Sequence, residues 1–403
     1  MTHISIETAA LKEGLKRLKG IIPSKPVVPI LSYCHFQCDG DKIYLTATDL
    51  EQTAQVCLYE SQFSEDISFC VELAPLLYLI SNSEKSETEI KVYDEKVVVL
   101  TDAGEYSLPI PVGEDFPEIP NFEGADEYFT CMPSKFESGL AHVIHAVGTD
   151  ELRPAMMHVQ LKTTIDGCGT FYATNGYVLS KYWDNSLAIR EDEVTVYTEN
   201  NFIKTLWSVS AAKNLTKFLK GTPIQVKQDN RRVFIIQGDD WYAFQQTEAA
   251  FPDIDSIHIP APVMTGTFDL SNLMEILGRM KVAIDGSTNH IRFTVNKNQG
   301  MYIVAQNEIN DRSGKEYIPM IVDNEDGPIR PPSLIDEEIV AGEDSMTLAV
   351  NLALFSDILA ALHYKDRVRM LFAAPNRTLS IVSVNTDDEE ACEKHLIMPI
   401  NLG

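Results

Sequence analysis

Two kinds of side chain in this sequence could do chemistry by their type and spacing. His142 and His145 stand three residues apart, which puts both on one face of a helix and could supply two metal ligands. No third ligand follows at a useful spacing, and one of the pair abuts the apolar stripe of a predicted helix, so a helix-surface role is favoured. Paired acids at 239–240, 387–388 and 389–390 each adjoin a turn signal. Neighbouring carboxylates on a strand point to different sides, so these pairs predict turns.

Motifs that would mark an enzyme are missing from the sequence. It contains no GxxxxGKS/T phosphate loop, no GxGxxG after a strand, no GxSxG and no HExxH. We therefore expect no catalytic residue, no metal and no cofactor. A nucleotide hydrolase that uses Asp239 or Asp387 with a metal is the least favoured alternative.

The balance of charge is strongly acidic, at −26, with 33 Lys and Arg against 59 Asp and Glu. This average argues against a nucleic-acid partner, because Lys and Arg carry phosphate binding. The basic residues nevertheless gather on the solvent faces of predicted helices, at Lys12, Lys16, Arg17, Lys19, Lys213, Lys217, Lys220, Arg279 and Lys281. If equivalent helices lined the hole of a ring, they would hold a nucleic-acid backbone without reading its bases. The plainer alternative is that Lys is common on helix surfaces and complements the helix dipole.

The helices that carry these residues belong to a unit that the chain repeats. The stretches TATDLE, YATNGY and VAQNEI align Ala47 with Ala173 and Ala305, and FPEIP at 116–120 returns as FPDID at 251–255. Repeated order at a fixed period indicates tandem copies of one structural unit. We predict three domains, at 1–124, 125–257 and 258–403. The third contains an acidic, proline-rich excursion at about 323–344, which we expect to be a surface loop without a role.

Each copy combines two helical patterns with several alternating, β-branched runs, which predicts an α+β fold with two helices packed on antiparallel sheet. The first helices have apolar stripes at Leu11, Leu15, Leu18 and Ile22, at Phe136, Leu140, Ile144 and Val147, and at Leu273, Ile276, Leu277 and Met280. The second helices are expected at 72–80, at 200–220 with Gly221 as a stop, and at 351–362.

The cysteines and the N-terminal residues indicate the cellular compartment in which the protein is expected. The seven cysteines form no CxxC pair and fall mostly in apolar runs, a pattern typical of buried thiols in a reducing cytoplasm. The first residues lack an apolar signal region, and no run approaches the ~20 apolar residues of a membrane span. We expect a soluble, cytoplasmic protein.

Several stretches, taken in order, resemble the bacterial DNA polymerase III beta subunit, the sliding clamp. They are KPVVPILSYCHFQCDGDKIYLTATDLEQTAQV at 25–56, FPEIP at 116–120, FYATNGYVLSKYW at 171–183, FPDI at 251–254 and HLIMPINLG at 395–403. The resemblance implies a head-to-tail homodimer, six similar domains in a closed ring and double-stranded DNA through its centre, with no catalysis. It also implies partners, namely the DNA polymerase III catalytic subunit, the clamp loader and other proteins with a clamp-binding motif.

The same resemblance implies positions for three kinds of site. A hydrophobic pocket for partner peptides would be formed by Met156, Thr174, Gly176, Tyr177, Val178, Leu179, Pro252, Ile257, Leu354, Thr378, Leu396, Met398 and Pro399. Lys25 and Arg153 match DNA-contacting positions, and Tyr106 and Ile284 match the dimer contact.

Two departures from the family pattern concern the pocket rim. Family members commonly have a basic residue at the position of Val178 and Arg at the position of Asn401. An alternative to a DNA-encircling ring is therefore a binding module that keeps the clamp fold and the peptide pocket but has lost the DNA role.

Overall fold

The computed structural model describes residues 2–400 apart from 60–61, 103, 112–114, 165–168, 188–201, 248, 285–288, 297–299, 308 and 322–344. The predicted excursion at 323–344 and Asn401 lie outside these residues. No helix within the described ranges combines the length and the apolar character that crossing a bilayer would need. Cys34, Cys38, Cys57, Cys70 and Cys131 are buried thiols, as their apolar surroundings predict, whereas Cys392 is exposed.

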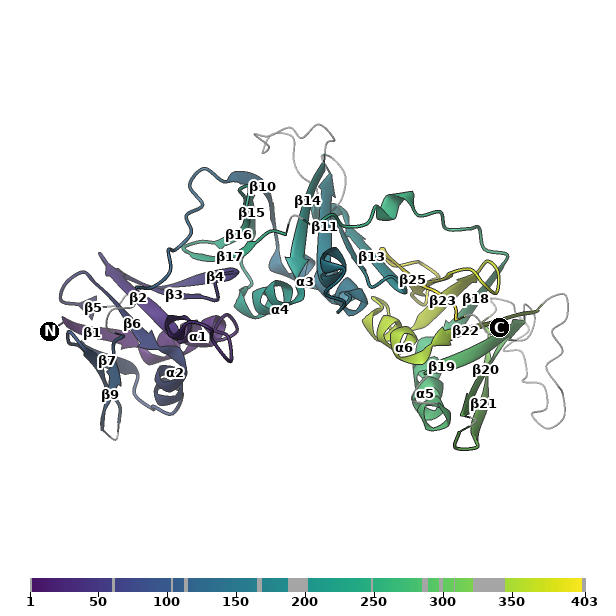
Figure 1. Cartoon of the computed structure of the whole chain (residues 1–403), viewed down its shortest axis with the longest axis horizontal. Coiled ribbons are helices and arrows are strands. Elements are labelled where there is room, and N and C mark those ends of the chain that lie inside the picture. Colours follow the sequence, from purple (N-terminus) through teal and green to yellow (C-terminus); the bar gives the residue numbers. More distant parts are fainter. Residues whose placement is uncertain are drawn as a thin grey trace. The chain divides into compact units, whose positions relative to one another are not determined.

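The order of helices and strands repeats three times along the chain (Figure 1). The first copy comprises β1 (Thr2–Glu7), α1 (Thr8–Leu18), β2 (Tyr33–Asp39), β3 (Lys42–Thr48), β4 (Gln52–Leu58), the short β5 (Gln62–Phe63), β6 (Ile67–Glu72), α2 (Leu73–Ser81), β7 (Glu87–Val92), β8 (Lys96–Leu100) and β9 (Glu105–Pro109). The second comprises β10 (Asp126–Cys131), α3 (Pro133–Val143), β11 (His158–Thr164), β12 (Gly169–Thr174), β13 (Val178–Asp184), β14 (Phe202–Ser208), α4 (Val209–Phe218), β15 (Ile224–Gln228), β16 (Arg232–Gln237) and β17 (Asp240–Gln245). The third comprises β18 (Met264–Asp269), α5 (Leu270–Met280), β19 (His290–Asn296), β20 (Gly300–Asn307), β21 (Arg312–Pro319), β22 (Ser345–Asn351), α6 (Leu352–Ala361), β23 (Arg367–Phe372), β24 (Leu379–Val384) and β25 (Glu393–Ile397).

The predicted α+β class with antiparallel sheet is confirmed. Every strand pair is antiparallel where its register is defined, and α1 contacts α2 as α5 contacts α6 (Figure 1). Ala47, Ala173 and Ala305 occupy equivalent buried positions in β3, β12 and β20, opposite Ala54, Ser180 and Gly314. Their alignment in the sequence therefore reflects a real structural repeat.

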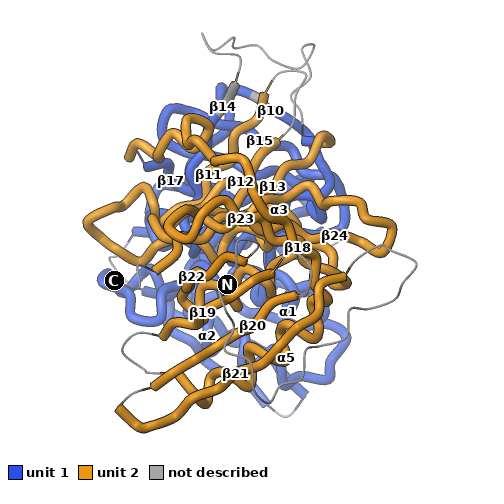
Figure 2. Tube along the Cα trace, turned by 90° about the vertical axis from the view of Figure 1, so that its right-hand side faces the viewer, with its two compact units in different colours: residues 1–136, 187–248 blue, residues 137–186, 249–403 orange. Residues whose placement is uncertain are grey.

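The chain forms two compact units, residues 1–136 with 187–248 and residues 137–186 with 249–403 (Figure 2). In the first unit, β17 of the second copy pairs with β4 of the first, with Tyr242 opposite Ala54. In the second unit, β25 of the third copy pairs with β13 of the second, with His395 opposite Ser180. We call each pairing between the fourth strand of one copy and the last strand of the next a joint. Because each joint makes one sheet continuous between two copies, the units do not follow the three predicted domains.

Most predicted helices are observed with small shifts at their ends. Leu11, Leu15 and Leu18 are fully buried on α1, whereas Ile22 lies beyond its end and Ile21 is buried instead. The stripe of α5 is buried as predicted, at Leu273, Ile276, Leu277 and Met280. In the second copy Phe136 and Leu140 are buried on α3, but Ile144 and Val147 follow the helix.

The predicted helix at 200–220 is wrong over its first part. Residues 202–208 form β14, whose Thr205, Leu206 and Trp207 are buried, and α4 begins only at Val209. β-branched and aromatic residues favour a strand there, and the Ser208 hydroxyl caps the helix by accepting from the Ala211 amide at 3.0 Å. The helix ends at Phe218, so Lys220 and Gly221 lie outside it.

Candidate functional site

The turn after β12 is held by its own side chains. Thr174 Oγ1 donates to the Val178 carbonyl at 2.7 Å, and Asn175 Oδ1 accepts from the amides of Tyr177 and Val178 at 2.9 and 2.8 Å. Gly176 adopts a φ of 88°, a left-handed conformation that glycine enters without a steric cost. The turn therefore leads the chain into β13 with a fixed geometry.

The first copy builds the same turn from different residues. Thr48 Oγ1 donates to the Gln52 carbonyl at 2.8 Å, and Asp49 Oδ1 accepts from the Glu51 and Gln52 amides at 3.0 and 2.6 Å. Leu50 occupies the place of Gly176 with a φ of 79°. The turn is thus part of the repeated scaffold, and its role in a site depends on what surrounds it.

Pairing of β13 with β25 gathers four predicted pocket residues. Leu179 lies opposite Leu396, and the Met398 amide donates to the Tyr177 carbonyl at 2.8 Å. Side chains alternate between the two faces of a sheet, so all four share one face. Leu179 and Leu396 are 9% and 5% exposed, whereas Tyr177 and Met398 are 67% and 50% exposed. The result is an apolar floor beside two exposed apolar side chains, which we call the groove.

Val178 lies on the opposite face from the groove. It pairs with Ile397 and is 2% exposed. Alternation along β13 therefore makes Val178 a core residue that supports the turn from beneath, and not a lining residue as the resemblance implies.

The segment that carries Pro252 and Ile257 is tied down on the groove face. Asp255 Oδ2 accepts from Lys162 Nζ at 2.5 Å and its Oδ1 from the Tyr172 hydroxyl at 3.0 Å, while Lys181 Nζ lies 4.0 Å away. Tyr172 and Lys181 are opposite each other and on the same face as Leu179. The hydrogen bond from Lys162 holds the pKa of Asp255 below its usual range.

Ile257 follows the anchored Asp255 by two residues and is 45% exposed. Sequence reasoning missed the anchor of Asp255, because Asp255 and Lys162 are far apart in the chain.

The remaining predicted pocket residues flank the same strands. The Met156 carbonyl accepts from the Gly148 amide at 2.8 Å, and a Cβ on Gly148 would lie 3.5 Å from Asn175, so Met156 adjoins the turn. Leu379 pairs with Ile397 between β24 and β25. Continuing this register by one residue places Thr378 beside Met398.

Pro399 and Leu354 lie next to the end of β25. Pro399 directly follows Met398, and the next residue, Ile400, donates its amide to the Ala349 carbonyl at 2.7 Å. Leu354 is half-buried in the first turn of α6, which begins just after Ala349, and its amide is capped by Asn351 Oδ1 at 3.1 Å. The structure therefore groups the predicted pocket residues around one sheet face and its ends, with the exception of Val178.

Apart from Lys281, which lines a pocket, the predicted basic residues fall into two groups. Lys16, Lys19, Lys25, Lys213 and Lys217 are exposed. Lys16 and Lys19 belong to α1 and its C-cap, and Lys213 and Lys217 to α4. The two helices touch, because Arg17 Nε donates to the Phe218 carbonyl at 2.8 Å. Exposed ammonium groups are thus concentrated on neighbouring helices of the first unit.

Other predicted DNA-facing residues make contacts within the chain. Arg17 is 7% exposed, with Nη1 2.6 Å from Asp240 Oδ2 and its guanidinium 4.3 Å from the Phe218 ring centroid, so its prediction as a solvent-facing residue is wrong. Asp240 is likewise a buried partner and not a solvated turn acid. The remaining contacts join Lys12 Nζ to the Ser81 carbonyl, Lys220 to Glu13 and Asp240, Arg153 to Asp150, and Arg279 to Glu316 and Glu275.

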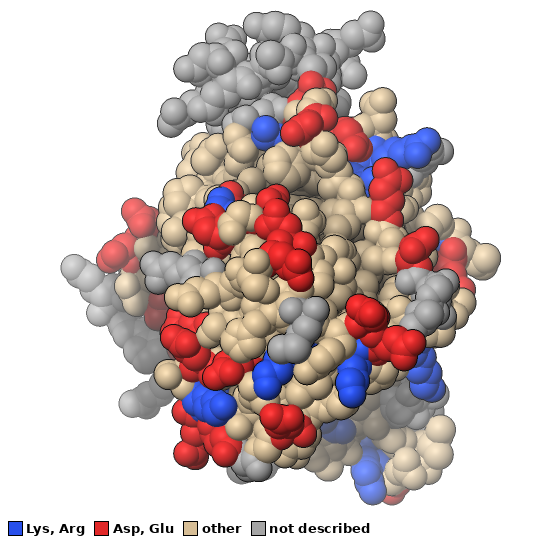
Figure 3. Space-filling view, turned by 90° about the vertical axis from the view of Figure 1, so that its left-hand side faces the viewer, with Lys and Arg blue, Asp and Glu red and all other residues tan. Residues whose placement is uncertain are grey.

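Acidic side chains are spread over the face of the molecule that Figure 3 draws. Lys and Arg lie scattered among them. The excess of acid is therefore not confined to one segment.

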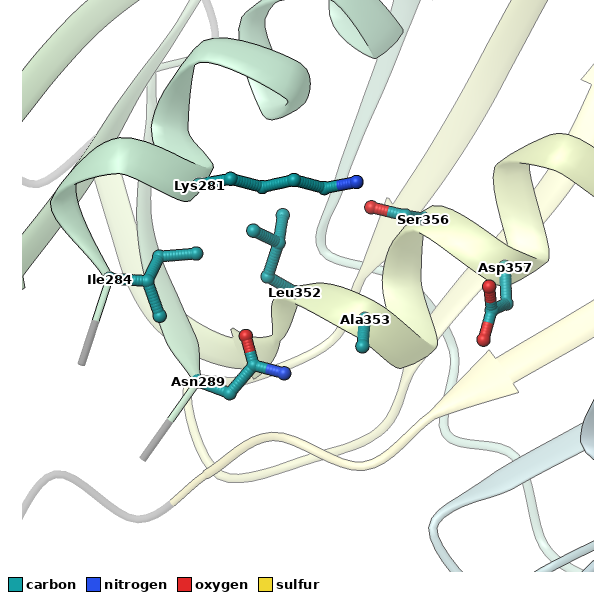
Figure 4. A pocket seen from close by; sticks show the side chains of 7 residues that line it. All are labelled: Lys281, Ile284, Asn289, Leu352, Ala353, Ser356 and Asp357. Atoms are coloured by element: carbon teal, nitrogen blue, oxygen red, sulfur yellow. The ribbon is translucent and has the colours of Figure 1, made fainter. Parts of the chain in front are cut away.

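The predicted dimer residues lie at two different places. Tyr106 is 43% exposed on β9, which is the last strand of its sheet. Ile284 helps to line a pocket of about 440 Å³ with Lys281, Asn289, Leu352, Ala353, Ser356 and Asp357. Figure 4 shows the Lys281 side chain reaching over Leu352 toward Ser356. Ser356 Oγ is buried and has no hydrogen-bond partner within the described part of the chain.

No group of three or more His, Cys, Asp or Glu suited to a metal ion occurs among the described residues. The prediction that His142 and His145 lie on a helix surface is wrong. The His142 side chain is 12% exposed, and His145 Nδ1 is buried. Asp239 accepts from Lys42 at 2.6 Å and from Tyr59 at 2.9 Å. These acids and histidines therefore serve contacts within the fold.

Comparison with known proteins agrees with this architecture. Residues 2–120 match the family model described as DNA polymerase III beta subunit, N-terminal domain. The beta sliding clamp of Synechococcus elongatus is 22% identical over 314 residues, which is 77% of this chain and 81% of that protein. The beta sliding clamp of Pseudomonas aeruginosa is 18% identical over 401 residues, 99% of this chain and 100% of that protein.

Solved structures of sliding clamps resemble this chain in fold over its whole length. A crystal structure of the DNA polymerase sliding clamp from Pseudomonas aeruginosa superposes with a TM-score of 0.82 at 16% identity, covering 100% of both chains. The DNA polymerase III beta subunit from Thermotoga maritima gives a TM-score of 0.82 at 18% identity, again covering 100% of both chains. The chain is therefore similar to the DNA polymerase III beta subunit, through the family model over residues 2–120, and it has the fold of the beta sliding clamps over its whole length.

Proposed function

We propose that this chain is a processivity factor that works as a head-to-tail homodimer, closing a ring around double-stranded DNA and catalysing no reaction itself. The groove then holds peptide segments of the DNA polymerase III catalytic subunit, the clamp loader and other partners. The observation that carries the proposal is the pattern of joints, because it leaves one joint strand open at each end of the repeat. The domain bounds 1–124, 125–257 and 258–403 and a cytoplasmic place of action belong to the same proposal.

The two joints within the chain show which equivalent strands remain without a joint partner. Fourth strands β4 and β13 pair with last strands β17 and β25. The equivalent strands left over are β21, at one edge of the sheet β21-β20-β19-β22, and β9, at the edge of another sheet. We infer a third joint between β21 of one chain and β9 of a second, because these are the fourth strand and the last strand that the two internal joints leave unpaired. Two chains joined twice in this way leave neither strand open, and heterologous contacts of this kind form rings when the rotation closes.

Side chains at the joints support the same pairing. Each joint places a large ring opposite a small residue, Tyr242 opposite Ala54 and His395 opposite Ser180. Tyr242 and His395 also pair with the fully buried Ile235 and Ile381 of the preceding strands. Tyr106 holds the same position opposite Val99, and Gly314 is equivalent to Ala54 and Ser180.

A Cβ on Gly314 would lie 3.1 Å from Met280 Sδ and 3.3 Å from Ala283 Cβ. A tyrosine from a second chain would therefore pack against the end of α5, beside Ile284.

The exposed lysines of α1 and α4 fit a loose hold on DNA. Lys16, Lys19, Lys213 and Lys217 have no acid partner among the described residues and can pair with phosphates. Phosphate contacts position a duplex without reading its sequence, and they weaken as salt rises. Surrounding acids disfavour binding elsewhere on the protein, so a sliding contact is expected.

Retention on DNA tests the ring. The full-length protein is incubated with a nicked circular duplex, ATP and the clamp loader of a bacterial DNA polymerase III, and then gel-filtered at moderate salt. We expect protein to elute with the circle and to be released when a restriction enzyme linearises it, because only the closed path retains it. Equal loss from circular and linear DNA would rule out encirclement. The same outcome with peptide binding intact would favour the module that keeps the fold without the DNA role, which the internal pairing of Arg17 and Arg279 supports.

Leu179→Asp tests the groove. A charge in the apolar floor is expected to weaken binding of a short fluorescent peptide rich in Leu and Phe by at least about 2 kcal/mol, roughly 30-fold, measured by fluorescence anisotropy. Met398→Asp, at an exposed position, should act in the same direction without disturbing the core. Val27→Asp, at a residue 96% exposed in the first unit, is the matched control and should bind as the parent does. Unchanged affinity in both groove variants would exclude the groove as the docking site.

A further inference from the structure

Four histidines surround one buried carboxylate beneath the groove. They are His142 on α3, His145 in the turn Ile144–Ala146, His363 after α6 and His395 on β25. Glu393 lies at their centre, with 0% exposure, and Tyr182 stacks on His142 with ring centroids 4.8 Å apart. His363 is exposed and also contacts Tyr364. These are the titratable groups that face the cluster from α3, β13, β25 and the chain after α6.

Glu393 holds these elements together by accepting hydrogen bonds. Its carboxylate accepts from the His363 amide at 2.9 Å and from the Ser383 hydroxyl at 2.5 Å, and it lies 3.4 Å from His395 Nε2 and 3.6 Å from His142 Nδ1. Burial raises the pKa of Glu393, but His395, Ser383 and the His363 amide outweigh burial and bring that pKa to about 2. Glu393 is therefore an anion throughout the neutral and mildly acidic range.

Two of the histidines share a single hydroxyl. Ser180 Oγ lies 3.0 Å from His145 Nε2 and 2.9 Å from His395 Nδ1. A hydroxyl has one proton, so it can donate to one imidazole and accept from the other, but it loses its donor role when both imidazoles carry protons toward it. Burial, together with the neighbouring His395, lowers the pKa of His145 to about 3.

A third histidine, His142, is tied to the end of α6 and the chain after it by two hydrogen bonds. His142 Nδ1 donates to the Ala361 carbonyl at 2.5 Å, which leaves Nε2 as the acceptor for His363 Nδ1 at 3.3 Å. Burial lowers the pKa of His142, and Ala361 and Glu393 oppose that shift.

Among the described residues, the carboxylate of the equivalent joint in the first unit is paired with Arg17 and Lys220, cations that keep their charge in the neutral and mildly acidic range. Asp240 is the counterpart of Glu393, because each lies two residues before the ring of its joint, Tyr242 or His395. Arg17 is the counterpart of His142, because each lies six residues after the first apolar residue of its helix stripe, Leu11 or Phe136. Arg17 and Asp240 form a buried pair at 2.6 Å. Arginine stays protonated at any working pH, so this joint keeps its charge balance where the histidine joint does not.

We propose that the joint between β13 and β25 is pH-sensitive and loosens when protons enter its histidine cluster, whereas the joint between β4 and β17 stays closed. One protonated histidine balances Glu393. A second leaves a net positive charge in a buried site that β13, β25 and the turn Ile144–Ala146 enclose. Relief comes from separation of the two strands.

The direction of the effect follows from linkage. A histidine whose folded-state pKa lies below its ordinary value of 6.5 binds fewer protons in the closed joint than in the open one. Its contribution to stability is therefore complete above about pH 6.5 and is lost as pH falls from there toward 3. Glu393 has a depressed pKa and contributes fully above its ordinary value of 4.5, so acidification to pH 5.5 leaves it unchanged.

The joint lies directly beneath the groove. Ser180 and His395 are adjacent in sequence to Leu179 and Leu396, on the opposite face of the same strand pair. Loosening the joint would therefore also separate the groove floor. This consequence rests on the proposed function, while the opening of the joint does not.

Hydrogen exchange of the full-length protein, without DNA or partner, tests the proposal. Amide protection in β13 and β25 is compared with protection in β4 and β17 at pH 7.5, 6.5 and 5.5, after correction for the intrinsic pH dependence of exchange. We expect the opening equilibrium of β13 and β25 to rise by up to about tenfold per pH unit for each proton taken up below pH 6.5. Protection of β4 and β17 should stay constant. An identical response of the two joints would overturn the proposal.

His145→Gln should reduce the pH response of β13 and β25, because glutamine can still bond to Ser180 but does not titrate. His290→Gln, outside the cluster on β19, is the matched control and should keep the full response. If His145→Gln leaves the response intact, His145 is not one of the proton acceptors and the proposal fails in that form. If the variant does not fold, the comparison of the two joints in the parent protein still decides. Neither outcome depends on whether the chain encircles DNA.

Discussion

Arg17→Ala is expected to lower the free energy of unfolding of the first unit by about 3–5 kcal/mol, the cost typical of removing one partner from a buried ion pair. The substitution leaves the Asp240 carboxylate buried, at 9% side-chain exposure, without its guanidinium. It also removes the hydrogen bond from Nε to the Phe218 carbonyl and the contact with the Phe218 ring. Urea unfolding followed by tryptophan fluorescence measures the change, since Trp241 neighbours Asp240 in β17.

Lys16→Ala is the matched control, because Lys16 is the exposed neighbour of Arg17 on the same helix. It should shift the free energy of unfolding by about 0.5 kcal/mol or less. The double variant Arg17→Met with Asp240→Leu should recover most of the lost stability, since apolar replacements remove both charges from the buried site. If Arg17→Ala and Lys16→Ala destabilise the protein equally, the ion pair does not stabilise the joint between β4 and β17.

Tyr106→Asp is expected to convert the dimer into a monomer of 45.1 kDa. In the proposed third joint this side chain faces Gly314 and packs on Met280 and Ala283 of a second chain. A carboxylate there would lose the ring contact and would have to be desolvated against an apolar surface, a cost of several kcal/mol. Because one chain closes the ring at two such joints, the loss counts twice. Sedimentation velocity measures the mass, and retention on the circular duplex should vanish with the dimer.

Tyr177→Asp controls for the removal of an exposed tyrosine. Tyr177 is 67% exposed in the groove, so its substitution should weaken peptide binding but leave the dimer intact. The edge strand β9 tolerates the Tyr106 change in the free chain, because Tyr106 is 43% exposed there. A Tyr106→Asp protein that remains dimeric at micromolar concentration would refute the third joint.

The fold could be predicted well wherever the signal is local. Apolar stripes at helical spacing defined α1 and α5, and the Ala-Thr-Asp and Ala-Thr-Asn turns marked equivalent strands of two copies. The failure at 202–208 has a local cause as well. A buried strand that runs directly into a helix reads as one continuous apolar segment, and only the capping serine marks the boundary.

Features that depend on distant partners could not be predicted in the same way. Helical spacing alone predicts a solvent position for Arg17, because its partner Asp240 lies 223 residues away in the chain. The groove depends on the pairing of Leu179 with Leu396, which no spacing in the sequence specifies. Its residues were available only through resemblance to a family, and alternation on β13 was the one local signal that separates Val178 from Leu179. The histidine cluster was missed because four separate segments contribute to it.

Joint strands β9 and β21 have a consequence for how copies of this chain can associate. The two strands are not equivalent, so the β9 strand of one chain needs the β21 strand of another chain as its partner, and not a second β9. Any linear stack, however long, ends in one unpaired β9 and one unpaired β21, and such edges invite further strand addition. Ring closure is then the chain's protection against open-ended polymerisation. A variant whose joints form at an altered angle would be expected to grow into a filament and not to remain a monomer.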